Sequence, residues 1–82
     1  MKYSIEFKRT AAKDLEKITP VEANKILTKI KNLENGITGD IKKMTNYTPE
    51  YRLRIGNFRI LFETIDDKII IYRIKHRKES YR

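Results

Sequence analysis

The sequence contains no cysteine and only one histidine among its 82 residues. Without cysteine the chain forms no disulfide and offers no thiolate to a metal ion. One histidine excludes a metal site built from several imidazoles, and it excludes any ribonuclease mechanism that needs two. The chain also lacks a glycine-rich phosphate loop and a carboxylate pair suited to acid–base catalysis. We therefore expect no metal and no cofactor.

Long hydrophobic runs are missing as well. No apolar run approaches the ~20 residues that a membrane-spanning helix needs, and the first residues do not resemble a signal peptide. We expect a cytoplasmic protein with no membrane partner. A chain of 82 residues predicts a single domain, residues 1–82, with one sheet face covered by one or two helices.

Positive charge is abundant and unevenly distributed. The net charge is +8. Residues 1–41 hold eight Lys/Arg and six Asp/Glu, whereas residues 42–82 hold eleven Lys/Arg and five Asp/Glu, so the second half carries most of the excess. This segregation favours a nucleic acid as partner over an acidic protein or an anionic lipid. The alternative is that the charge serves solubility alone.

A hairpin is the strongest local pattern. Gly56-Asn57 separates two runs of alternating apolar residues, which is typical of a two-residue turn. The turn predicts four opposed pairs: Ile55 with Phe58, Arg54 with Arg59, Leu53 with Ile60, and Tyr51 with Phe62. Arg52, Arg54 and Arg59 then share the polar face. Opposed like charges destabilise a sheet, so an anion that binds there relieves a repulsion. The alternative is a solvated face with Glu63 as a local partner.

The remaining elements predict an α+β fold. A strand is expected over residues 2–7, a helix over 8–18 with Asp14 on its outer side, and a second helix that Thr19 caps and that ends near Asn35-Gly36. Residues 36–50 read as a loop. Strands over 58–65 and 69–75 complete a three-strand antiparallel meander in a four-stranded sheet with the helices on one face.

The last strand is expected to continue both faces of the hairpin. A three-residue turn at residues 66–68 predicts the following pairs: Tyr72 with Phe62, Ile74 with Ile60, Arg73 with Leu61, and Lys75 with Arg59. Arg73 and Lys75 thus extend the arginine cluster as RNA-binding candidates.

Several candidates for chemistry lie at the C-terminal end. His76 follows the last expected strand, and histidine is the side chain best suited to acid–base work near neutral pH. The alternative is an ordinary surface histidine at the end of the strand. Tyr81 offers a ring on which an unpaired base could stack, or it anchors the tail by packing. Arg77 and Lys78 could bind phosphate, or they are simply solvated.

Residues 51–63 and 74–81, together with the order of elements, resemble the RelE branch of the RelE/ParE toxin superfamily. The resemblance implies a cytoplasmic toxin with an antitoxin partner. It implies cleavage of messenger RNA in the ribosomal A site, without a metal, by a ribose 2′-OH. It also implies catalytic roles for a set of residues: Arg52, Arg54, Arg59, Arg77 and Tyr81. Arginine stays protonated and is a poor base, so we expect the arginines to stabilise the transition state and His76 or Tyr81 to transfer protons.

Two other functions remain open at this point. A ParE-like protein would share the fold and inhibit gyrase without nuclease activity. A non-catalytic RNA-binding module would use its arginines only to hold the backbone, with binding that weakens steeply as salt rises.

Overall fold

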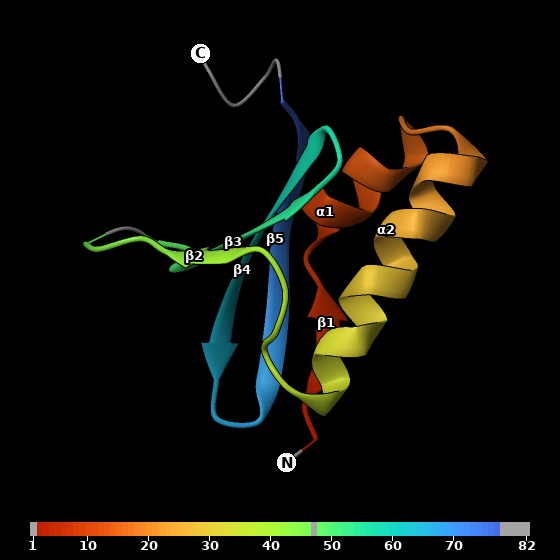
Figure 1. Ribbon diagram of the computed structural model, residues 1–82. Coiled ribbons are helices and arrows are strands. Elements are labelled where there is room, and N and C mark those ends of the chain that lie inside the picture. The colour runs from red at the N-terminus through yellow and green to blue at the C-terminus, as the bar shows by residue number, and fades with distance from the viewer. Residues whose placement is uncertain (1, 47, 78–82) are drawn as a thin grey trace.

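A computed structural model of the chain describes residues 2–46 and 48–77. Two helices pack on one face of a five-stranded sheet (Figure 1). The elements in chain order are β1 (Ser4–Phe7), α1 (Arg9–Glu16), α2 (Pro20–Asn32), the 3-10 turn η1 (Leu33–Asn35), β2 (Ile41–Lys43), β3 (Tyr51–Ile55), β4 (Phe58–Ile65) and β5 (Lys68–His76). The strands lie in the order β1-β5-β4-β3-β2. β1 runs parallel to β5, and the other neighbours are antiparallel. The predicted α+β class is confirmed.

The sheet has five strands rather than the four predicted. The additional strand, β2, lies within the segment that was expected to be a loop, and it pairs with β3 through Ile41–Leu53, Lys42–Arg52 and Lys43–Tyr51. Three residues with a single apolar side chain carry too little alternation to indicate a strand from sequence. The pairing places Lys42 beside Arg52, which extends the basic surface described below.

The second helix begins as predicted. The backbone N–H of Glu22 donates to Oγ1 of Thr19 at 3.4 Å, and Pro20 occupies the first helical position. Ile26 and Ile30 are buried against the sheet. Both helices are shorter than expected, and none in the described part of the chain combines the length and apolarity required to cross a bilayer.

The hairpin of β3 and β4 has the predicted register at all four pairs. Gly56 adopts the left-handed conformation, with φ of 55°, that such a turn requires. The rings of Tyr51 and Phe62 stack with centroids 5.2 Å apart on the core face. Leu53, Ile60 and Phe62 are buried beneath the helices.

The turn between β4 and β5 has two residues, Asp66 and Asp67, rather than the three predicted, because Lys68 pairs with Ile65. A bulge in β5 offsets the missing turn residue. Leu61 lies opposite Arg73 and Ile60 opposite Ile74, as expected, but Phe62 lies opposite Ile71 rather than Tyr72. Tyr72 is the extra residue. An extra residue breaks the strict alternation of faces, so Ile71 and Ile74 both enter the core although three positions separate them.

Asp14 faces the sheet, although the helical pattern predicted that it would face outward. β1 pairs with the edge of β5 only up to Ile71. Beyond that residue, Asp14 of α1 supplies the hydrogen-bond acceptor at this edge. Its carboxylate accepts the backbone N–H of Ile74 at 2.9 Å and the Nε of Arg73 at 2.8 Å. Burial alone would raise the pKa of Asp14, but these two hydrogen bonds and the positive charge of Arg73 and Lys17 outweigh it, so the pKa is lowered from 3.8.

Candidate nucleic-acid interface

Three basic residues line up across three neighbouring strands. Arg54 of β3 lies opposite Arg59 of β4, and Arg59 lies opposite Lys75 of β5. Paired residues on adjacent strands, which lie about 4.8 Å apart, point to the same side of a sheet. The neighbouring residues Leu53, Phe58 and Ile60 are buried in the core. The basic side chains therefore point to the other side of the sheet, which the helices leave uncovered (Figure 1). We call the three basic residues the basic row.

A second line of residues adds to the basic row. Arg52 is two positions from Arg54 and therefore on the same face, with Lys42 of β2 on one side and Leu61 on the other. The surface formed by these basic side chains is named here the basic face: Lys42, Arg52, Arg54, Arg59 and Lys75. Lys42 was missed at the sequence level because β2 was not recognised. The only signal was the pair of adjacent lysines at 42 and 43.

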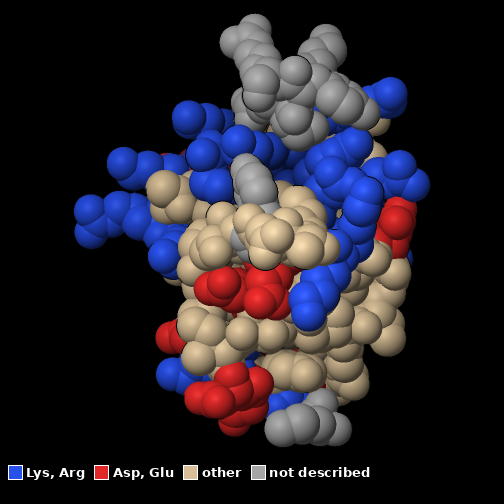
Figure 2. Space-filling model, turned by 90° about the vertical axis from the view of Figure 1, so that its left-hand side faces the viewer, with Lys and Arg blue, Asp and Glu red and all other residues tan. Residues whose placement is uncertain are grey.

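Charge is divided along this side of the molecule. Figure 2 shows Lys and Arg gathered in its upper part and Asp and Glu in its lower part. The acidic end includes the β4–β5 turn with Asp66 and Asp67.

Glu63 accepts a hydrogen bond from the hydroxyl of Tyr72 at 2.8 Å. That bond, with partial burial and the negative charge of Glu63, raises the pKa of Tyr72 above 10.0.

Arg54 has a carboxylate partner at the edge of the basic face. Its Nε lies 2.7 Å from Oδ2 of Asp40, and both side chains are 60% exposed. The backbone N–H of Arg54 also donates to the carbonyl of Asp40 at 3.0 Å. Exposed ion pairs contribute at most about 1 kcal/mol, so a phosphate group can displace this carboxylate.

His76 lies on the opposite side of the sheet from the basic row. It is the last residue of β5 and pairs with the buried residue Phe58, whose ring it meets edge-on at 5.2 Å. It lines a pocket of ≈ 250 Å³ together with residues from α1 and the start of α2, among them Thr19 and Glu22. The structure therefore does not bring His76 together with Arg54 and Arg59.

Arg73 is directed toward α1. Its guanidinium forms two hydrogen bonds with Asp14, from Nε at 2.8 Å and from Nη2 at 3.2 Å, and the side chain is 40% exposed. Such a bidentate pair fixes the plane of the guanidinium. Arg73 thus joins β5 to α1 and stands apart from the basic row.

Arg77 follows β5 and is exposed. Its backbone N–H donates to the carbonyl of Asn57 at 2.6 Å, which keeps it at the end of the sheet where the basic row lies. Lys78 and Tyr81, the remaining candidates of the tail, lie outside the described residues.

The sequence and the fold match known proteins. The family model described as the ParE toxin of the type II toxin-antitoxin system, parDE, matches residues 5–81. Toxin RelE3 of Methanocaldococcus jannaschii is 36% identical over 80 residues, which cover 92% of this chain and 91% of the relative.

Solved structures give the same result. The crystal structure of a RelB–RelE antitoxin–toxin complex from Methanococcus jannaschii superposes with a TM-score of 0.77 at 35% identity, and the match covers 92% of this chain and 93% of the other. A chromosomal ParDE system from P. aeruginosa shares the fold, with a TM-score of 0.69 at 23% identity over 92% of this chain and 96% of the other.

These matches define the chain as a toxin of a type II toxin–antitoxin system. Within that class it belongs to the RelE/ParE family. Because RelE-named and ParE-named proteins share this fold, the choice between their activities depends on the surface and the sequence rather than on the topology.

Proposed function

We propose that this toxin is an endoribonuclease that cleaves messenger RNA in the ribosomal A site. The observation that carries the proposal is the basic face, with five cationic residues on the side of the sheet that the helices leave uncovered. The named relative at 36% identity is a RelE toxin. Its site of action would be the cytoplasm, where messenger RNA is translated.

The proposed reaction is a transesterification. The 2′-OH of one ribose gives up its proton as its oxygen bonds to the adjacent phosphorus. The bond from phosphorus to the 5′-oxygen of the next nucleotide breaks, that oxygen takes up a proton, and a 2′,3′-cyclic phosphate is formed. Negative charge builds on the phosphoryl oxygens in the transition state. Arg54 and Arg59 lie opposite each other, and Arg52 is two positions away, so guanidinium groups can approach those oxygens from one side without a metal ion.

Other residues are proposed to complete the interface. Arg77 and Tyr81 keep the catalytic roles that the resemblance implies, and Lys75 and Lys78 would hold the RNA backbone. Proton transfer by His76 at the same phosphate is disfavoured because its side chain lies on the helix side of the sheet. Tyr81 is therefore the proposed proton carrier. Arg73 forms an ion pair with Asp14, so we propose it only as a secondary RNA contact.

An antitoxin is the second proposed partner. The related RelE toxin was crystallised with its RelB antitoxin. A surface with a net charge of +8 suits an acidic segment that folds as it binds. Such a segment would cover the basic face and block access to RNA.

The proposal is tested with ribosomes programmed with messenger RNA. Arg59→Ala should lower the cleavage rate by about 100-fold or more, because removing one transition-state hydrogen-bond donor typically costs that much. Arg9→Ala is the matched control, since Arg9 is an exposed arginine of α1 outside the basic face, and it should cut within about twofold of the unchanged protein. Unimpaired cleavage by the Arg59→Ala protein refutes the catalytic assignment.

Gyrase inhibition is a second candidate because the matching family model is described as a ParE toxin. It predicts linear DNA accumulating when the toxin is added to gyrase, with no new RNA ends. The third candidate, RNA binding without catalysis, predicts salt-sensitive RNA retention with no cut product. Measuring RNA ends and DNA breaks on the same preparation separates all three.

A further inference from the structure

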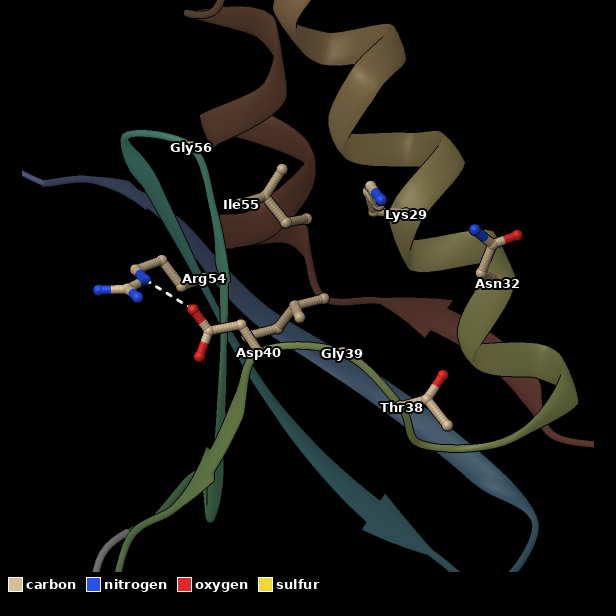
Figure 3. Close-up of a pocket in the computed structure, with 9 residues that line it drawn as sticks. Lys29, Asn32, Thr38, Gly39, Asp40, Arg54, Ile55 and Gly56 are labelled. Atoms are coloured by element: carbon tan, nitrogen blue, oxygen red, sulfur yellow. Dashed lines mark hydrogen bonds and ion pairs between the residues drawn. The ribbon is translucent and has the colours of Figure 1, made fainter.

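A pocket of ≈ 340 Å³ lies next to Arg54 of the basic row. It is at the edge of β3 that does not pair with β4. Its walls come from three segments: Lys29 and Asn32 of α2, the stretch after η1 that includes Thr38, and β3 with Ile55. Figure 3 shows Arg54 and Asp40 on one side of it, Asn32 and Thr38 on the other, and Ile55 between them. The volume falls within the roughly 300–1,000 Å³ range of pockets that hold small organic groups.

The local backbone explains why the space is open. β2 pairs with β3 only up to Leu53, so next to Ile55 the edge of β3 has no neighbouring strand. Gly39, with φ of 115°, carries the chain past Leu53, and a Cβ at that position would lie 3.5 Å from Cδ1 of Leu53. Lys29 and Asn32, three residues apart, present their side chains from the same face of α2.

The lining suits a nucleobase. Leu53 and Ile55 supply apolar surface against which a flat ring can lie. The amide of Asn32 and the hydroxyl of Thr38 each donate and accept hydrogen bonds, whereas the ammonium of Lys29 only donates. Proteins read single-stranded RNA by splaying out bases, packing on their faces and bonding to their edges.

Arg54 connects this pocket with the basic row, since it belongs to both. A phosphate held by Arg54 and Arg59 would leave its attached nucleoside next to the pocket opening. We propose that the pocket receives the base of a nucleotide adjacent to the cleaved phosphate, and that Lys29 and Asn32 determine which base is preferred. Because Lys29 only donates, the preferred bases are guanine and uracil, whose O6 and O4 accept at the position where adenine and cytosine carry an amino group that donates. This inference rests on the proposed RNA cleavage.

The test uses messenger RNA with a randomised A-site codon on programmed ribosomes, with the new RNA ends sequenced. The unchanged toxin should favour guanine or uracil at one codon position. Asn32→Ala and Lys29→Gln should weaken that preference about tenfold, because each removes a contact to the preferred base. Asn35→Ala is the matched control, an exposed asparagine outside the pocket lining, and it should keep the preference.

The outcomes distinguish this inference from the proposed function. If the variants keep the base preference of the unchanged toxin, the proposal that this pocket selects the base is wrong. The same conclusion holds if the variants change only the affinity for the antitoxin. If the unchanged toxin cuts nothing, the cleavage proposal fails, and the pocket is then judged by binding of 2′-O-methyl hexamers of each single base. A different order of the four affinities in Asn32→Ala supports the pocket, and an identical order refutes it.

Discussion

Replacing Asp14 with alanine should destabilise the fold more than any other single charge removal on α1. The change removes the carboxylate that accepts three hydrogen bonds, two from nitrogens of Arg73 and one from the backbone N–H of Ile74. Hydrogen bonds to a charged group contribute about 1.5–3 kcal/mol each when buried. The side chain of Arg73 is 40% exposed, so water compensates part of its loss. We therefore expect the free energy of unfolding to fall by about 2–3 kcal/mol.

That loss is large for a chain of this size, whose expected total stability is about 4–12 kcal/mol. With a urea dependence of about 1 kcal/mol per molar, the unfolding midpoint should move down by about 2–3 M. Far-ultraviolet circular dichroism during urea titration measures it. Glu16→Ala is the matched control, because Glu16 is an exposed carboxylate on the same helix, and it should shift the midpoint by less than about 0.5 M.

The pH dependence provides an independent check. Asp14 has a lowered pKa in the folded chain, so its contribution is fully present above 3.8 and is lost as the pH falls through the lower folded value. The difference in stability between the unchanged chain and Asp14→Asn, which does not titrate, should be constant from pH 7 to about pH 4 and should narrow in more acidic solution. Equal midpoints for the unchanged chain and Asp14→Ala at pH 7, or a difference that widens with acid, would refute the argument.

Two further predictions concern the face without helices. Asp40→Asn should raise the affinity for single-stranded RNA about threefold at low salt, since it removes the carboxylate that competes for Arg54; filter binding measures this, and lower affinity would contradict it. Tyr72→Phe should abolish the tyrosine absorbance change that appears at the highest pH in an alkaline titration, because the hydrogen bond to Glu63 raises the pKa of Tyr72 above 10.0. If the variant instead loses a change that appears at lower pH, another tyrosine has the raised pKa.

The hairpin was predictable from sequence because a two-residue turn fixes its register. Gly56-Asn57 leaves one pairing that keeps polar and apolar residues apart, and that pairing puts Arg54 opposite Arg59. The face shared by the three arginines followed directly. The position of Lys75 opposite Arg59 was also predicted correctly, because the extra residue Tyr72 offsets a turn that is one residue shorter than predicted.

Features that depend on distant contacts were not predictable in the same way. The bulge at Tyr72 occurs next to three consecutive isoleucines, where alternation carries no information. The pair of Asp14 with Arg73 joins residues far apart in sequence, so no local period indicates it. The pocket beside Arg54 exists because β2 is short, which only the three-dimensional pairing reveals.

The parallel pairing of β1 with β5 links the first strand to the last. During translation the N-terminal strand therefore emerges long before the strand that completes its hydrogen bonding, and the sheet closes only after β5 has been synthesised. A chain interrupted before β5 lacks both the neighbour of β1 and the lysine that ends the row across the sheet. Such a chain cannot complete the five-stranded sheet, so the basic row is whole only in molecules that include β5.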